Sequence, residues 1–163
     1  MERVFKAKAQ DMALASQIMI TSFRTSFATF VSRETMDACT NPENCRKMLE
    51  GIFEDEKMHF LMGADQGFIC WQDTPEGVEI MAIHSLPESW GTGLGGAMLT
   101  KALEQIGNSP VYLWAFKENK RAHRFYEKHG FCRDGSERIS GFDGAVEVRY
   151  QRSGAAGIEE NYE

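Results

Sequence analysis

The sequence predicts a single α/β domain of mixed α+β type, with a central, mostly antiparallel sheet of about seven strands and helices on both faces. Apolar residues switch between helical and strand periods in the order β, helices, βββ, α, β, α, ββ. The 163 residues are 42% hydrophobic and 26% charged, as in ordinary globular proteins. We therefore expect one domain over residues 1–152 and a flexible tail over 153–163, where no burial pattern is visible.

The first part of the chain should form one strand followed by helices. We expect a strand over residues 3–7 and a helix over about 11–27, in which an apolar residue recurs every four positions. Ser32 and Asn41 are candidate N-caps of two further helical segments. Pro42 follows Asn41 at the first helical position, where a missing N–H is harmless.

The remaining elements follow from a change of period and from turn residues. Turns rich in Gly, Asp and Pro should join three consecutive antiparallel strands. The expected elements are strands over residues 58–64, 67–71 and 78–85, a helix ending near Gly107, a strand over 111–116, a helix after Asn119, and a hairpin of strands over 131–139 and 145–151.

A glycine loop, Gly91-Thr92-Gly93-Leu94-Gly95-Gly96, precedes the helix that ends near Gly107. Bare backbone N–H groups at the start of a helix favour binding of a pyrophosphate. The spacing also fits a dinucleotide-binding fingerprint, with Glu118 downstream, but the chain is too short after the loop for further parallel βα units. A P-loop is excluded because no Gly-Lys-Ser/Thr follows.

The segment Asn119-Lys120-Arg121-Ala122-His123-Arg124-Phe125-Tyr126-Glu127-Lys128-His129-Gly130-Phe131 supplies an amide and a phenol from a second helix. Asn119 can cap this helix and also reach a ligand. Ala122, Phe125, Tyr126 and His129 lie on one face at helical spacing. One side of the helix should therefore face the core and one end should face a cleft.

Together the loop and this segment resemble the GNAT superfamily of N-acetyltransferases, over nearly the whole chain. The family loop, Gln/Arg-x-x-Gly-x-Gly/Ala, aligns with Trp90 to Gly95, and Trp90 replaces the usual first residue as in one branch of the superfamily. The second signature, Asn-x-x-Ala-x-x-Phe-Tyr-x-x-x-Gly-Phe, is matched at every fixed position by Asn119 to Phe131.

The resemblance implies transfer of an acetyl group from acetyl-CoA to a primary amine, by direct attack in a ternary complex. Tyr126 would be the general acid that protonates the leaving thiolate. Arg121, Arg124 or Lys128 could contact the 3′-phosphate. The residues expected to bind acetyl-CoA are Ile83, Ser85, Trp90, Gly91, Thr92, Gly93, Leu94, Gly95, Gly96, Asn119 and Tyr126.

A general base is needed because an alkylamine is mostly ammonium at pH 7. Glu79 lies within an apolar strand, and simple alternation places it on one face with Met81 and Ile83, where burial would raise its pKa. His84, expected on the opposite face, is the second candidate, and a water chain is the third.

The acceptor side should come from Phe23, Phe27 and Phe30, together with the last hairpin. A net charge of −6 argues against a nucleic-acid partner and favours a cationic acceptor such as a polyamine. A peptide N-terminus or lysine is the alternative acceptor. A different class of function, a non-catalytic CoA-binding regulatory module, also fits the loop.

The remaining expectations concern metals, location and assembly. The four cysteines show no C-x-x-C spacing, so no metal is expected. No apolar run is long enough to span a bilayer and the first residues are too polar for a signal peptide, so we expect a cytoplasmic protein without a membrane partner. Monomer and homodimer both remain open.

Overall fold

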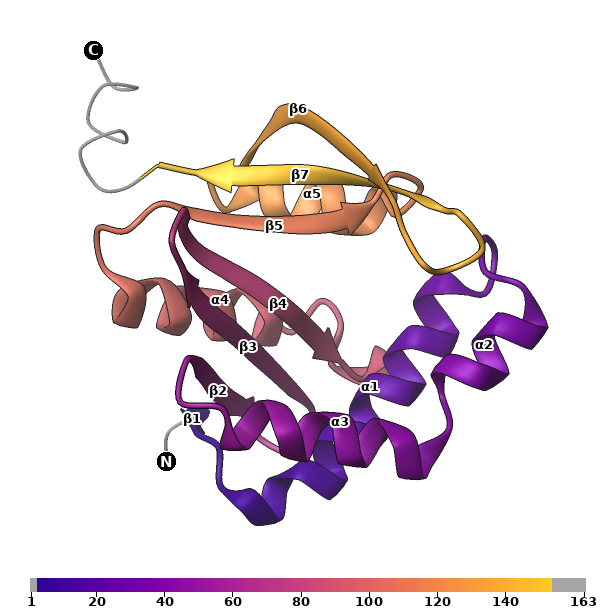
Figure 1. Ribbon diagram of the computed structural model, residues 1–163. Coiled ribbons are helices and arrows are strands. Elements are labelled where there is room, and N and C mark those ends of the chain that lie inside the picture. Colours follow the sequence, from indigo (N-terminus) through magenta and orange to yellow (C-terminus); the bar gives the residue numbers. More distant parts are fainter. Residues whose placement is uncertain (1–2, 154–163) are drawn as a thin grey trace.

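The chain forms a seven-stranded sheet with helices on both faces (Figure 1). The structure is a computed structural model and describes residues 3–153, so residues 154–163 of the expected tail lie outside the described residues. The strands are β1 (Val4–Lys6), β2 (Met58–Gly63), β3 (Gly67–Thr74), β4 (Gly77–Ser85), β5 (Val111–Phe116), β6 (Cys132–Ile139) and β7 (Val146–Arg152). The helices are α1 (Met12–Phe27), α2 (Arg33–Cys39), α3 (Pro42–Glu54), α4 (Leu94–Ile106) and α5 (Lys120–Lys128), with 3-10 turns at Ala9–Asp11 and Pro87–Ser89.

The sheet has the strand order β1-β2-β3-β4-β5-β7-β6. The pair of β4 and β5 is parallel, and the other described strand pairs are antiparallel. This arrangement confirms the expected mixed, mostly antiparallel sheet. It also places α4 in the connection between the two parallel strands.

Strands β4 and β5 pair over a very short length and then diverge. The paired residues are Val78 with Val111 and Glu79 with Tyr112. Gly77 allows the close approach there, because its φ is +134° and a Cβ would lie 2.6 Å from the Pro110 carbonyl oxygen. Beyond Glu79 the two strands separate (Figure 1), so the edge of β4 that faces β5 has no strand partner among the described residues.

Local capping groups define the helix ends that the sequence predicts. The Ser32 hydroxyl accepts from the N–H of Thr35 at the start of α2. The Asn41 side chain accepts from the N–H of Asn44 at the start of α3, with Pro42 at the first helical position. Gly107 ends α4 with a φ of +75°. These contacts satisfy helix N–H and C=O groups that have no partner within the helix.

A β-bulge in β4 changes the faces on which its side chains lie. Cys70 pairs with Ala82 and Trp71 pairs with Ile80, so Met81 is an extra residue. Simple alternation was therefore wrong across this point, because an extra residue reverses the faces of the residues that follow. Glu79 does not share a face with Ile83, and His84 lies on the same face of the sheet as Glu79 rather than on the opposite one.

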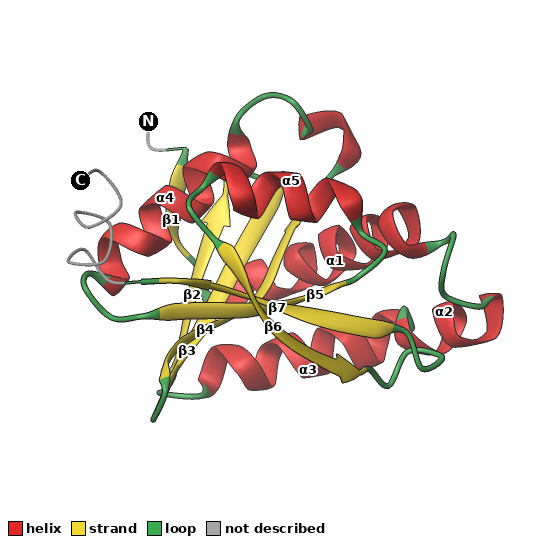
Figure 2. Ribbon diagram, turned by 90° about the horizontal axis from the view of Figure 1, so that it is seen from above, coloured by secondary structure: helices red, strands yellow, loops and turns green. Residues whose placement is uncertain are grey.

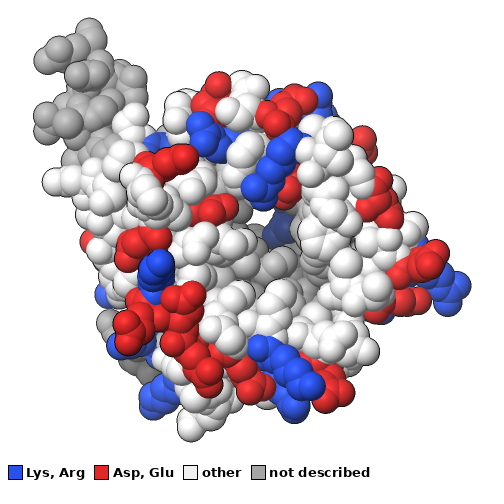
Figure 3. Space-filling view, viewed as in Figure 1, with Lys and Arg blue, Asp and Glu red and all other residues white. Residues whose placement is uncertain are grey.

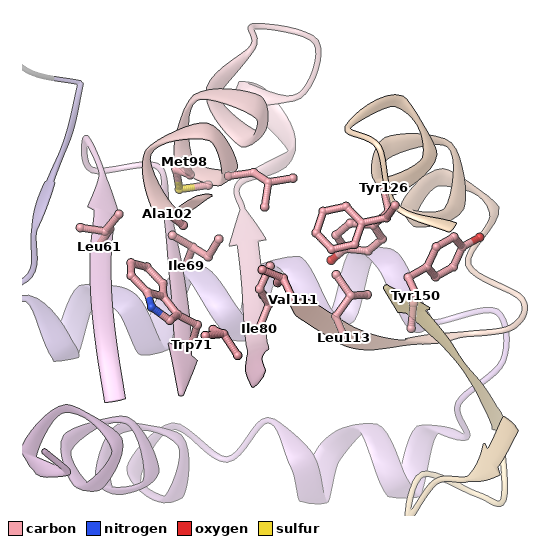
Figure 4. Close-up of a cluster of buried hydrophobic side chains, with 14 of the residues drawn as sticks. Leu61, Ile69, Trp71, Ile80, Met98, Ala102, Val111, Leu113, Tyr126 and Tyr150 are labelled. Atoms are coloured by element: carbon pink, nitrogen blue, oxygen red, sulfur yellow. The ribbon is translucent and has the colours of Figure 1, made fainter. Parts of the chain in front are cut away.

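Helices cover both faces of the sheet (Figure 2), and a separate apolar cluster lies beneath them on each face. One cluster joins the sheet to α4 and α5, with Met98, Leu99 and Tyr150 fully buried (Figure 4). The other joins the sheet to α1 and α3, with Ile18 and Leu49 fully buried. Burial of large apolar side chains on both faces holds the diverging strands between two helical layers.

Two glycine substitutions test how the parallel strand pair is stabilised. Gly77→Ala should lower the free energy of unfolding by about 1–3 kcal/mol, because an L residue is strained at its φ and its Cβ meets the Pro110 carbonyl. Gly51→Ala, within α3 where a Cβ meets nothing within 4 Å, should raise it by about 0.4–1 kcal/mol. Urea unfolding measures both changes. Equal stability of the two variants would contradict this account of the β4 and β5 junction.

Candidate functional site

A cavity of about 720 Å³ opens where β4 and β5 diverge. Residues 80–85 of β4 and 113–116 of β5 line it, together with side chains from α1, α3 and α5. Figure 3 shows this face hollowed near its centre, with walls formed mostly by uncharged residues. The site is therefore formed by the separation of two sheet strands.

The glycine loop lies at one end of this cavity and begins α4. Gly91 and Gly93 have φ values of +80° and +85°, and Gly93 is the N-cap of the helix. Among the described residues, no backbone carbonyl accepts from the N–H groups of Gly91, Gly93, Leu94, Gly95 or Gly96. Unpaired N–H groups at a helix start suit a bound anion, so the loop fits a pyrophosphate.

Arg3 brings a positive charge to this loop from the other end of the chain. Its Nη2 donates to the Thr92 carbonyl oxygen at 3.1 Å and to the Thr92 hydroxyl at 3.2 Å. Arg3 is not among the residues predicted from the sequence, because it lies 89 positions before Thr92 in the chain. No local spacing signals such a contact.

The last two glycines of the loop allow close packing against α5. A Cβ on Gly95 would lie 3.2 Å from the Phe125 ring, and one on Gly96 would lie 3.1 Å from His129. Substitution at either position would therefore push α5 away from α4. This packing brings the loop close to the residues that α5 contributes to the cavity.

Asn119 and Tyr126 both line the cavity from α5. The Asn119 Oδ1 accepts from the N–H of Ala122 at 3.2 Å, which confirms the cap and leaves the side-chain NH₂ group available. Tyr126 is 8% exposed, and its ring packs against Phe125 and Phe131. Figure 4 shows its ring extending from α5 toward the sheet. Burial raises the pKa of this phenol, so it stays protonated and can act as a donor.

Trp90 connects the loop to both β4 and α5. Its Nε1–H donates to the Ser85 carbonyl oxygen at 3.1 Å. The Arg121 guanidinium stacks on the indole, 3.5 Å from the ring centroid. Of the three basic residues considered for the 3′-phosphate, Arg121 is the one that lines the cavity in the described part of the chain.

The two candidate bases occupy different positions. Glu79 is not part of the cavity lining, and its Oε1 accepts from the Gln72 side chain at 3.1 Å. His84 does line the cavity, with its Nδ1 3.0 Å from the Ser22 hydroxyl. Burial lowers the pKa of His84 to about 4, so the imidazole is neutral near pH 7.

Three cysteine thiols also line the cavity, at positions 39, 45 and 70. Burial raises the pKa of each thiol, and that of Cys70 reaches about 12. These thiols are therefore protonated at neutral pH and are weak nucleophiles. Within residues 3–153 there is no cluster of three His, Cys, Asp or Glu residues that could hold a metal ion.

The part of the cavity where we expected the acceptor contains residues that the sequence did not identify. Phe23 and Phe27 line it as expected, whereas Phe30 packs behind them against Phe27. Phe142 and Glu147, from the last hairpin, also line it. The sequence indicated this hairpin as an acceptor region but named no residue in it, because the turn shows no motif.

Comparison with known sequences agrees with this geometry. The model described as "Acetyltransferase (GNAT) family" matches residues 17–131. The chain is 34% identical over 61 residues to the "Probable N-acetyltransferase Rv2775" of Mycobacterium tuberculosis, a match that covers 37% of the chain and 35% of that protein. The chain thus spans about a third of the length of this curated relative. In the described residues, no helix has the length and apolar character needed to cross a membrane.

Solved structures show the same fold at low sequence identity. A PaiA N-acetyltransferase from Thermoplasma acidophilum, in complex with coenzyme A, has a TM-score of 0.78 and 16% identity, over 92% of this chain and 97% of that one. A point mutant of the spermidine N-acetyltransferase SpeG from Vibrio cholerae has a TM-score of 0.68 and 14% identity, over 97% and 98%. With a family model that matches more than half of its length, the chain belongs to the GNAT family of acetyltransferases.

Proposed function

We propose that the protein transfers an acetyl group from acetyl-CoA to a primary amine by direct attack within a ternary complex. One observation carries the proposal. A loop with unpaired N–H groups and a buried, protonated tyrosine meet at the same cavity, between two strands that have separated. This is the arrangement that a pyrophosphate ligand and a thiol leaving group require together.

The residues for acetyl-CoA binding follow the cavity from one end to the other. The unpaired N–H groups of Gly91, Gly93, Leu94, Gly95 and Gly96 would bind the pyrophosphate, with Arg3 adding positive charge. The open edge of β4 at Ile83 and at the Ser85 N–H would hydrogen-bond the amides of the pantetheine arm, as an added strand does, while the Ser85 carbonyl already accepts from Trp90. Asn119 would reach the same arm through its free amide nitrogen.

The reaction transfers protons at two places. As the amine nitrogen forms its bond to the acetyl carbon, the bond from carbon to sulfur breaks, the nitrogen loses a proton and the sulfur gains one. The Tyr126 hydroxyl would donate to the sulfur, because its phenol is kept protonated. The cavity thiols are protonated too, which favours direct attack by the amine over an acetyl-cysteine intermediate.

We assign proton removal to His84 in place of Glu79. Glu79 lies outside the cavity lining and is hydrogen-bonded to Gln72. His84 faces the cavity as a neutral imidazole, but a pKa of about 4 makes it a weak base. It would therefore take the proton while the new bond forms, when the nitrogen becomes acidic, rather than from a free ammonium ion.

Acetyl-CoA should stabilise the fold, whereas NAD and ATP should not. At a hundredfold excess over its dissociation constant, the expected gain is about 2.7 kcal/mol. Gly93→Asp should abolish this gain because a carboxylate would face the pyrophosphate. Gly107→Asp is the matched control, since it also strains a positive φ at a helix end but lies at the opposite end of α4. Thermal unfolding with and without acetyl-CoA measures the difference, and a melting curve that acetyl-CoA leaves unchanged would overturn the proposal.

Tyr126→Phe should lower kcat by about a hundredfold or more and leave acetyl-CoA affinity nearly intact, because it removes a proton donor and little volume. Tyr112→Phe is the control, since the Tyr112 hydroxyl contacts Thr74 outside the cavity lining. Steady-state thiol release and calorimetric titration separate the two effects. Equal kcat in wild type and Tyr126→Phe would show that Tyr126 is not the general acid and that its role is packing in the core.

The pH dependence of kcat/KM should identify the base. His84 has a pKa of about 4, so it is deprotonated throughout pH 6–8 and adds no inflection there. The wild-type rate should rise about tenfold per pH unit toward the amine pKa as the neutral amine becomes more abundant. His84→Gln should give a parallel curve about tenfold lower, while Glu79→Gln should coincide with wild type. If Glu79→Gln instead lowered kcat/KM across this pH range, Glu79 would be the general base.

A further inference from the structure

The cavity contains an aromatic wall made by three separate parts of the chain. Phe23 and Phe27 of α1, Phe116 at the end of β5, and Phe142 between β6 and β7 all line the cavity. We call these four residues the phenylalanine wall. Their ring centroids lie 4.5 Å apart for Phe23 and Phe27, 5.4 Å for Phe23 and Phe142, and 4.9 Å for Phe27 and Phe116. Edge-to-face and tilted contacts of this kind leave ring faces and edges available to a further ring.

The wall is held in place by a polar contact outside it. Asp143 follows Phe142 and has a φ of +57°. Its carboxylate accepts from the Thr35 hydroxyl and from the N–H of Ser32, at the start of α2. These two hydrogen bonds lower the pKa of Asp143, so the contact is intact at neutral pH. Phe142 is therefore held against α1 in the absence of ligand. Less conformational entropy of this loop is then lost when a ligand binds.

The cavity lining has almost no negative charge that could bind a polycation. Among the described lining residues, the charged side chains are Arg121 and Glu147, and His84 is neutral. Arg121 is a cation and stacks on Trp90. Glu147 is already paired with Arg138, at 2.9 Å from its Nε. A second or third ammonium group would therefore be buried without a carboxylate partner, which is costly.

These observations weaken the basis of the polyamine expectation. That expectation depended on the net charge of −6 and on Glu79 near the reacting amine. The structure places Glu79 outside the cavity lining. Among the described residues, Glu147 is the acidic side chain of the cavity lining, and the acidic groups visible in Figure 3 lie on the outer surface of this face, where water and salt screen them from the cavity.

We infer that the acceptor is a primary amine joined by a short aliphatic linker to an aromatic ring. The ring would pack against the phenylalanine wall, and the linker would carry the amine toward Tyr126 and His84. This inference rests on the proposed acetyltransferase function and specifies its acceptor. The reaction would release the N-acetylated arylalkylamine and free CoA.

The test compares three acceptors on the full-length protein with acetyl-CoA as donor. Thiol release is followed with 2-phenylethylamine, n-butylamine and spermidine. We expect kcat/KM for 2-phenylethylamine to exceed that for n-butylamine by at least about tenfold, because the ring buries apolar area against the wall. It should exceed that for spermidine by about a hundredfold, because the extra ammonium groups would be buried unpaired. Equal or higher kcat/KM for n-butylamine or spermidine would overturn the inference.

Variants of the last hairpin test whether the wall causes this preference. Phe142→Ala should reduce the ratio of kcat/KM for 2-phenylethylamine over n-butylamine to no more than about threefold. The ratio cancels any loss of folded protein, because both rates come from the same preparation. Ile139→Ala is the matched control, since Ile139 is 77% exposed in β6 of the same hairpin and is not part of the cavity lining. An unchanged ratio in Phe142→Ala would overturn the assignment of the wall.

The two proposals fail in different ways. Calorimetric titration with acetyl-CoA and the amine panel are run on one preparation. If acetyl-CoA binds and spermidine or n-butylamine is the better acceptor, the acetyltransferase stands and the aromatic acceptor is rejected. If acetyl-CoA binds and no amine in the panel or among glycyl peptides releases thiol, the proposed function fails and the acceptor inference fails with it.

Discussion

The site depends on how short the parallel pairing of β4 and β5 is. Two residue pairs hold the strands together, Val78 with Val111 and Glu79 with Tyr112. The neighbouring residue, Gly77, can approach the Pro110 carbonyl closely because it has no Cβ. Beyond that point the strands diverge, and backbone groups of β4 are left without a strand partner among the described residues. Exposed strand edges usually attract another chain. Here the open edge faces the cavity, where a ligand with amide groups can pair with it.

Glycines in the loop serve two separate physical needs. Gly91 and Gly93 adopt positive φ values, which direct the chain into α4 with its first N–H groups unpaired. Gly95 and Gly96 lie where α5 packs most closely, and a side chain there would collide with Phe125 or His129. The same short segment therefore presents the unpaired N–H groups of the proposed anion site and keeps Tyr126 beside it. Arg3 and the pair of Trp90 and Arg121 then add positive charge around the loop.

Burial keeps Tyr126, His84 and the three cysteine thiols of the cavity in their neutral forms. The Tyr126 phenol and the cavity thiols stay protonated, and His84 stays unprotonated, each because charge is disfavoured away from water. An apolar environment favours a neutral amine as the nucleophile, and it favours an acceptor in which that amine is attached to an apolar group. The acidic outer surface affects the encounter of charged molecules with the protein, and the chemistry inside depends on local contacts.

Much of this protein was determined by local sequence. The order of strands and helices, the caps at Ser32, Asn41 and Asn119, and the positions of the glycine loop and Tyr126 all follow from spacing within a few residues of each other. Helix periods, caps and glycine backbone angles are local properties, so they can be predicted from the sequence alone.

Only the tertiary structure decided which side chains meet at the cavity. The bulge at Met81 depends on pairing with β3. It places His84 on the same face of the sheet as Glu79, whereas simple alternation predicted the opposite face. Arg3 reaches Thr92 across 89 residues, and Phe142 joins α1 through the contact of Asp143 with the start of α2. Contacts between distant segments depend on how the layers pack. No sequence spacing encodes that packing, so the phenylalanine wall became visible only in the folded chain.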